Sequence, residues 1–232
     1  MSGLAGAVVR TGLPVKPRWR GWLHFWAFLV SIATGAVLIS LAAFSSERAV
    51  VGASIYAVTV SLLFGTSALY HRRNWDAHGR SVMKRLDHSM IFVFIAGTYT
   101  PFALLVLPRE FGEVILAVVW LGALGGIVLK QAWITAPRWV TVPPYLALGW
   151  VAVFVLPAML RQAGLAPLLL LIIGGLIYTF GAIVYATRRP DPAPAVFGYH
   201  EVFHLCTIVA ALCHYIAIWF AVYSGPLGGH MG

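Results

Sequence analysis

The chain has 232 residues, of which 60% are hydrophobic and only 10% are charged, and its net charge is +9. A soluble globular protein carries about a quarter charged residues, and this composition excludes one because too few charges remain to cover a surface in water. The high hydrophobic share also excludes a disordered chain, and two cysteines are too few for a disulfide-stapled secreted domain. The composition therefore indicates an integral membrane protein.

Seven apolar runs are long enough to cross about 30 Å of hydrocarbon, which takes about 20 helical residues. Helices are predicted because lipid offers the backbone no hydrogen-bond partner and because the runs lack the alternation of a barrel strand. Kinks are expected near Pro101 and Pro157, and Gly122 and Gly126 form a small-xxx-small pair suited to close helix contact. The predicted spans are Trp22–Phe44, Ala49–Tyr70, Asp87–Leu107, Phe111–Leu129, Val140–Leu160, Leu165–Ala186 and Tyr199–Tyr223. The sequence thus predicts an all-α fold, a bundle of seven transmembrane helices.

The basic residues predict how this bundle lies in the membrane. With seven spans, 13 of the 16 Lys and Arg residues fall on the side of the N-terminus. The positive-inside rule then predicts a multi-pass protein of the inner (plasma) membrane, with its N-terminus in the cytoplasm and its C-terminus outside. On this prediction, residues 1–21 form a short basic cytoplasmic segment, residues 22–224 the transmembrane domain and residues 225–232 a short tail. Because the charges flank spans and form no single basic face, the expected partners are membrane lipids and not nucleic acid.

Placing an ionisable side chain inside a membrane span costs free energy, so the few that are present mark candidate functional sites. His71 ends the second span, with Ser67 one turn before it, and Asp87 opens the third. His200 and His204 lie one turn apart near the start of the seventh span. The predicted topology puts all five residues at the cytoplasmic side, so residues that are far apart in the sequence share one depth in the membrane.

These residue types suit a catalytic zinc site. His200 and His204, at positions i and i+4, project from the same helix face and can bind one metal ion through two imidazoles. A third imidazole from His71 completes a three-histidine site for Zn²⁺ whose fourth tetrahedral position is open, as in catalytic zinc sites. Asp87 is predicted to accept a proton from water at this site, and Ser67 to orient that water or to donate to a developing oxyanion.

Each residue also has a simpler explanation when it is taken alone. Asp87 is typical of a helix N-cap, and Ser67 of a small residue that bonds the backbone of its own helix. His24 and His78, near the ends of spans, are expected at the membrane interface. His88 is next to Asp87 but points about 100° away around the helix, so it ranks below the site candidates.

Residues 200–204 spell HExxH, the motif in which Glu201 would be the general base of a zinc peptidase. The context weakens this interpretation, because Ala210 stands where a metzincin has its third histidine and no acidic residue follows Glu201 as a further ligand. Glu201 is instead expected at the interface, turned toward water or a lipid head group. Deeper in the same span, His214 either lines a cavity or is a core histidine with satisfied hydrogen bonds.

Four ordered motifs run through the chain: SALYH at 67–71, RLDHS at 85–89, AGTYTP at 96–101 and GYHEVFH at 198–204. With these motifs, the chain resembles the hemolysin III family over essentially its whole length. This family is the bacterial branch of the progestin and adiponectin receptor family, in a superfamily that includes alkaline ceramidases. The resemblance implies zinc held by His71, His200 and His204, with Asp87 reaching the metal through water and Ser67 beside the first ligand.

Three functions follow as hypotheses. The first is a zinc-dependent hydrolase of a lipid amide or ester bond, with the acyl chain of its substrate between the helices, as the likeness to alkaline ceramidases implies. The second is a membrane sensor or homeostasis factor in which zinc has a structural role. The third is a membrane-lytic, pore-forming protein, as the historical name of the family implies. The spans offer few charges to line a water-filled pore, which favours the hydrolase over the third hypothesis.

Overall fold

The computed structural model describes residues 16–223, and this part of the chain forms eight α-helices and no β-strand. Seven segments are long and apolar enough to span a membrane, because α5 and α6 together make one of them. The predicted all-α bundle of seven spans is therefore confirmed. The predicted tail 225–232, and residues 1–15 of the predicted N-terminal segment, lie outside the described residues. The helices are α1 (Trp22–Ala42), α2 (Glu47–Arg72), α3 (Ala77–Leu105), α4 (Arg109–Ala132), α5 (Arg138–Trp150), α6 (Ala152–Gln162), α7 (Leu165–Thr187) and α8 (Tyr199–Tyr223).

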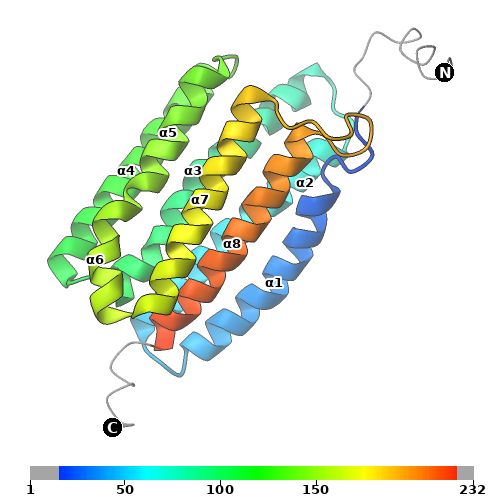
Figure 1. Ribbon diagram of the computed structural model, residues 1–232. Helices are drawn as coiled ribbons and strands as arrows, with labels where there is room; N and C mark the ends of the chain where they lie inside the picture. The colour runs from blue at the N-terminus through cyan, green and yellow to red at the C-terminus, as the bar shows by residue number, and fades with distance from the viewer. Residues whose placement is uncertain (1–15, 224–232) are drawn as a thin grey trace, which may run out of the picture.

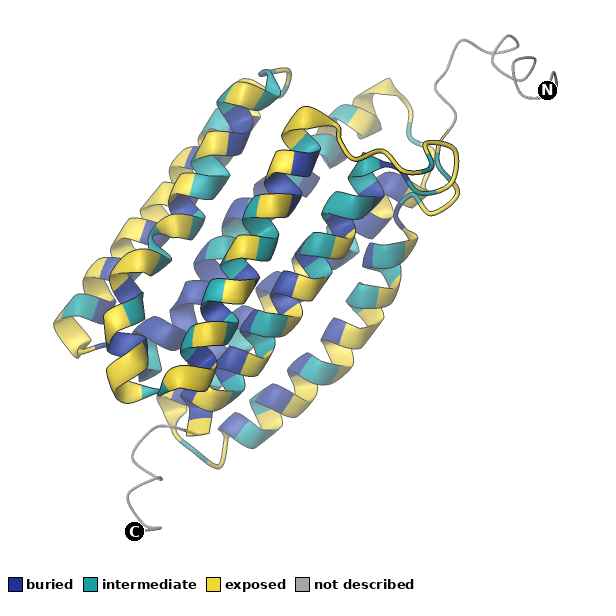
Figure 2. Ribbon diagram, viewed as in Figure 1, coloured by how far each residue is buried: buried dark blue, intermediate teal, exposed yellow. Residues whose placement is uncertain are grey.

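The helices lie side by side and run along roughly one direction (Figure 1). Each of α1 to α4 packs against the next, α7 packs against α8, and α8 also contacts α1, α2 and α3. Buried residues face the inside of this bundle and exposed ones the outside (Figure 2). In α3, 61% of the most apolar 18-residue stretch is buried, against 22% in α1, so α3 is the more enclosed helix. Polar residues of α3 are therefore placed to face protein instead of lipid.

One end of the bundle gathers the elements that carry the candidate site residues. α2 ends there, and α3 and α8 begin there. The segment ahead of α1 lies at the same end, beside the loop between α7 and α8 (Figure 1). We call this end the histidine end. These helix ends meet because successive helices run in alternating directions, so the end of one span lies beside the start of another.

The third helix begins earlier than predicted. The apolar run opens at Asp87, but α3 starts at Ala77 and is capped by Asp76, whose carboxylate accepts a hydrogen bond of 2.7 Å from the N–H of Gly79. The polar residues after this cap continue the helix ahead of its apolar part. Asp87 therefore lies about three turns inside α3, and its interpretation as an N-cap is wrong. Pro101 lies within α3 and does not end it.

The fifth span, predicted as one helix over Val140–Leu160, is divided between α5 and α6. The hydroxyl of Tyr99 on α3 donates to the carbonyl groups of Leu148, at 3.2 Å, and Gly149, at 2.6 Å. In an unbroken helix these carbonyls accept from the N–H groups four residues later, so a side chain has entered the helical ladder at the break. Pro157, the expected position of a kink, lies beyond the break and inside α6.

The glycine pair of α4 does lie at close helix contacts. A Cβ atom added at Gly126 would fall 2.3 Å from the ring of Phe92 on α3, and one at Gly122 would fall 2.8 Å from Leu148 on α5. Phe92 is itself enclosed, with 1% of its surface exposed. The absence of a side chain at Gly126 therefore lets the Phe92 ring fill the space between α3 and α4.

Gly126→Ala is expected to destabilise the bundle by about 1–3 kcal/mol, the usual effect of overpacking a core, because the enclosed ring of Phe92 has little room to move. Gly125→Ala is the matched control, since no atom lies within 4 Å of a Cβ added there. Thermal unfolding of the two purified variants in detergent checks the prediction. Equal melting temperatures would contradict it.

Candidate metal centre

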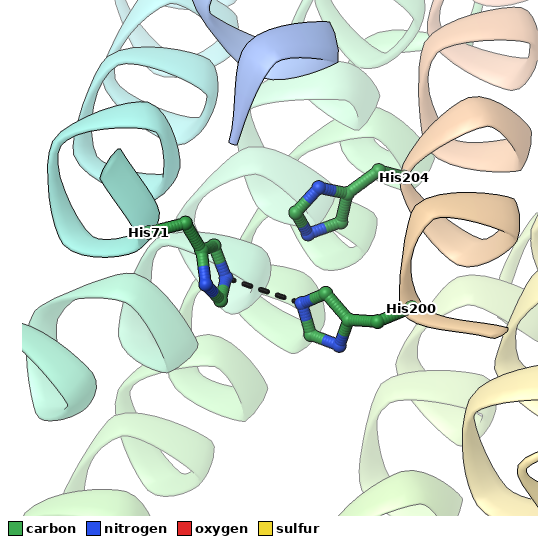
Figure 3. Close-up of side chains that lie close together, drawn as sticks. All are labelled: His71, His200 and His204. Carbon is green, nitrogen blue, oxygen red and sulfur yellow. Dashed lines mark hydrogen bonds between the residues drawn. The ribbon is translucent and has the colours of Figure 1, made fainter. Parts of the chain in front are cut away.

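The histidine end brings together His71, His200 and His204, whose side chains point toward one another from α2 and α8 (Figure 3). One ring nitrogen from each residue lies within 4.8 Å of those of the other two. The Nε2 atoms of His71 and His200 are 3.1 Å apart, and the three ring centroids are separated by 4.5 to 5.1 Å. The three predicted ligands are therefore close enough to bind one metal ion.

Local structure explains this convergence. His200 and His204 lie one turn apart on α8, so their side chains leave the same face of the helix. His71 lies in the last turn of α2, which contacts α8. The side chains of His71 and His204 are buried and that of His200 is half-buried, so little water competes for their nitrogen atoms.

The spacing of two of the donor atoms matches that of two ligands on a tetrahedral ion. Two nitrogen ligands bound to zinc at about 2.0–2.1 Å in tetrahedral geometry lie about 3.3 Å apart, and the Nε2 atoms of His71 and His200 are separated by 3.1 Å. The ring of His204 also presents a nitrogen toward the other two rings (Figure 3). Three imidazoles that converge at this spacing suit a divalent metal ion.

Asp87 and Ser67 lie beside the histidine cluster. The Oδ2 atom of Asp87 is 3.9 Å from the Nε2 atom of His71. Ser67, one turn before His71 on α2, lies next to the Asp87 side chain, to which its hydroxyl can donate a hydrogen bond. Both side chains are buried and line the same cavity. The structure thus places both residues next to the cluster, and their catalytic roles stay predictions.

An apolar cavity of about 290 Å³ leads from the histidine cluster into the bundle. His200, His204 and Asp87 belong to its lining, as do Trp150 of α5 and Leu171 of α7. Almost all of the lining surface is apolar. The cavity therefore suits a hydrocarbon chain that lies between the helices with its polar group at the histidines.

His24, expected at the membrane interface, is 3% exposed and lies against the cluster. Its ring stacks on that of His204, with centroids 3.8 Å apart and planes inclined by 13°. The expectation is wrong because the first turn of α1 faces α8 and the inside of the bundle. His78 is exposed, and its place at the membrane interface stays a prediction. His24 thus supports the ring of a candidate ligand, and sequence reasoning missed it; its one signal is its place at the predicted cytoplasmic end of the first span.

Glu201, also expected at the interface, is completely buried. Its carboxylate accepts hydrogen bonds from the Nε of Arg20, at 2.5 Å, and from the backbone N–H of Gly198, at 2.9 Å. The second bond closes the first turn of α8 in the manner of a capping box. Because both oxygens are engaged in this way, Glu201 is a structural anchor of α8, and the structure gives no support to its interpretation as the base of an HExxH peptidase.

The segment before α1, residues 16–21, covers the histidine end, and we call it the N-terminal strap. The N–H groups of Arg18 and Trp19 donate to the carbonyls of residues 195 and 196 in the α7–α8 loop, at 3.2 and 3.1 Å. At Gly21 the backbone has a φ of +79°, and an added Cβ would fall 2.9 Å from the Cβ of His71. Glycine at this position therefore lets the strap pass directly over a candidate metal ligand.

His88 lies nearer to the site than its direction on the helix suggests. Its Nδ1 atom is 2.8 Å from the carbonyl of Lys84 and 3.6 Å from the Oδ2 atom of Asp87. The carbonyl group can only accept, so it fixes the hydrogen of His88 on Nδ1. His88 also lines the cavity, and it thus forms part of the polar surroundings of Asp87.

Arg20→Gln is expected to destabilise the protein by about 3 kcal/mol, at the low end of the loss from breaking a buried ion pair, because the Arg20 side chain is 23% exposed and that of Glu201 is 0% exposed. Adding Glu201→Gln should restore part of this loss, since no unpaired charge is then buried. Thermal unfolding in detergent measures both effects, with the exposed Arg18→Gln as control. A single variant as stable as the parent would show that the pair does not anchor α8.

Comparison with known proteins gives concordant matches. The family described as Haemolysin-III related matches residues 14–215. The Hemolysin-3 homolog of Bacillus subtilis (strain 168) is 30% identical over 204 residues, which cover 88% of this chain and 92% of that protein. Hemolysin-3 of Bacillus cereus is 30% identical over 203 residues, with coverages of 86% and 88%. The human Monocyte to macrophage differentiation factor is 29% identical over 212 residues, with coverages of 88% and 84%. The chain is therefore a multi-pass membrane protein that belongs to the haemolysin III-related family.

Proposed function

We propose that this protein is a zinc-dependent hydrolase that cleaves an amide or ester bond of a membrane lipid. The observation that supports the proposal is the position of the three histidines, Asp87 and Ser67 at one end of an apolar cavity between the helices. A soluble substrate has no need of such a cavity, whereas the acyl chain of a lipid fills it. The substrate is therefore a lipid whose scissile bond lies near its polar end.

We assign zinc to the cluster because three imidazole ligands with an open fourth position are typical of catalytic zinc. His71, His200 and His204 would hold the ion. When it is bound, zinc supplies a Lewis acid that polarises a carbonyl group and activates water. The stacked ring of His24 and the capped first turn of α8 hold two of these ligands in place.

Asp87 and Ser67 supply the proton chemistry in this proposal. Asp87 accepts a proton from the attacking water and returns it to the leaving nitrogen or oxygen as the C–N or C–O bond breaks. The Ser67 hydroxyl orients that water or donates to the oxyanion that develops on the carbonyl oxygen. The burial of both side chains keeps bulk water away from these hydrogen bonds and strengthens them.

We infer from the basic residues of the loops that the histidine end faces the cytoplasm. The substrate is then a lipid of the cytoplasmic leaflet of the plasma membrane, whose chain enters the cavity while its head group stays near the leaflet surface. A head group near the leaflet surface agrees with the position of the histidine cluster, which lies at one end of the spans and not at their centre.

The purified protein is expected to contain about one zinc ion per chain, since the three histidines form one site. His71→Ala should remove most of this zinc because it deletes one of three ligands. His78→Ala is the matched control, an exposed histidine outside the cluster. Elemental analysis of the three proteins gives the answer. Zinc that is absent from the parent, or equal in all three, would refute the metal assignment.

Asp87→Asn is expected to lower the rate constant kcat for hydrolysis of a lipid amide, such as an N-acylated long-chain amine, by about 10²- to 10⁴-fold, the usual contribution of a general base. Its zinc content should stay near that of the parent, because Asp87 is not one of the three histidine ligands. Product release from detergent-solubilised substrate measures the rate, and a chelator should abolish it.

Two further results would replace the proposal with another function. A protein that binds zinc, unfolds more readily without it and cleaves no lipid amide or ester has a structural zinc. A protein that releases dye from liposomes equally well with and without zinc is membrane-lytic.

A further inference from the structure

Two buried polar atoms deep in the cavity wall have no hydrogen-bond partner in the described part of the chain. They are the hydroxyl oxygen of Tyr178 on α7 and the Nδ1 atom of His214 on α8. Both side chains line the cavity, and their ring centroids are 5.7 Å apart. An unpartnered polar atom inside the bundle is energetically costly, and a group bound in the cavity that these side chains line could supply the missing partner.

Gly174 on α7 leaves space for the His214 ring in the cavity wall. Its side chain is 8% exposed, and its Nε2 atom is 3.4 Å from the carbonyl of Leu171. A Cβ atom at Gly174 would fall 2.5 Å from the same Nε2 atom, so α7 has no side chain where the imidazole ring lies. His214 is therefore held in a fixed position against α7.

The hydrogen bond to Leu171 also defines what the two atoms can bind. A carbonyl oxygen only accepts, so Nε2 of the neutral His214 ring carries the hydrogen and Nδ1 is left as an acceptor. The Tyr178 hydroxyl offers a donor hydrogen. One acceptor and one donor on neighbouring rings of the cavity wall are complementary to an alcohol group, which donates one hydrogen bond and accepts others.

Several other polar side chains in the cavity wall are satisfied within the protein. The Tyr99 hydroxyl donates to the Gly149 carbonyl at 2.6 Å. Thr98 and Thr207 each donate to the carbonyl four residues earlier in their own helix, at 2.8 and 3.0 Å. Among the described side chains of the cavity wall, buried polar atoms without a partner therefore occur at two places: at His24 and His204 beside the histidine cluster, and at Tyr178 and His214 farther along the cavity.

We propose that Tyr178 and His214 form a deep polar subsite that binds a hydroxyl group carried on the hydrocarbon chain of the ligand. His214 follows His204 by ten residues, which places the subsite about 15 Å farther along α8 than the histidine cluster. The α7 and α8 helices pack side by side, so both residues face the same cavity (Figure 1). The inference rests on the proposed lipid ligand, but it does not depend on hydrolysis of that ligand.

Equilibrium binding to the purified full-length protein in detergent tests the subsite. The probes are octadecanoic acid and hydroxyoctadecanoic acids in which the hydroxyl group moves stepwise along the chain. The parent protein should bind the acid with the hydroxyl at one mid-chain position about threefold to tenfold more tightly than octadecanoic acid, the value of one or two net hydrogen bonds. The preference should fall off when the hydroxyl is moved in either direction.

Tyr178→Phe deletes only the donor and should abolish this preference while octadecanoic acid binds as before. His214→Gln retains an amide that can reach the Leu171 carbonyl and removes Nδ1, and it should have the same effect. Tyr99→Phe is the matched control, because its hydroxyl already has a partner, and it should keep the preference.

A parent protein without a position-dependent preference overturns the subsite, as it would if the two atoms only bind buried water. A preference that survives in both Tyr178→Phe and His214→Gln overturns it as well, and so does one that is lost in Tyr99→Phe. If no acid binds at all, the cavity is not a lipid site and the subsite is refuted with it. A preference without any turnover contradicts the proposed hydrolysis and leaves the subsite standing.

Discussion

Hydrocarbon gives a polar side chain no hydrogen-bond partner, and this constraint determines how the histidine end is built. His71, His200 and His204 leave water together because they face one another across α2 and α8. Glu201 is buried because Arg20 supplies a positive charge and the start of α8 an N–H group. The packing of α2, α8 and the N-terminal strap is therefore a condition for burying these groups. The same polar contacts then fix how the helices meet.

Much of this arrangement could be predicted from the sequence. Hydropathy and length decide whether a helix spans a membrane, so each long apolar run identified a span, and Tyr199–Tyr223 coincides with α8 at both ends. Successive spans run in opposite directions, which is why His71 at the end of one span and His204 near the start of another were expected at one depth. Side-chain spacing on a helix then placed His200 and His204 on the same face.

The errors have a common physical origin. Nearly uniform apolar helices carry little information about how each one is rotated about its axis, so His24 was expected at the interface although it faces His204. Irregular segments add partners that no periodicity reveals, and the strap brings Arg20 over the buried Glu201. The division of the fifth span likewise depends on a hydroxyl from another helix, that of Tyr99.

The contact between Arg20 and Glu201 joins residues 181 positions apart in a chain of 232 residues. Chains are synthesised from the N-terminus, and early segments fold before late ones exist. The strap therefore has no Glu201 to contact until α8 has been synthesised. The proposed metal site needs His71 from α2 together with His200 and His204 from α8, so it forms only once α8 has been made. A chain that stops before α8 lacks two of the three histidines.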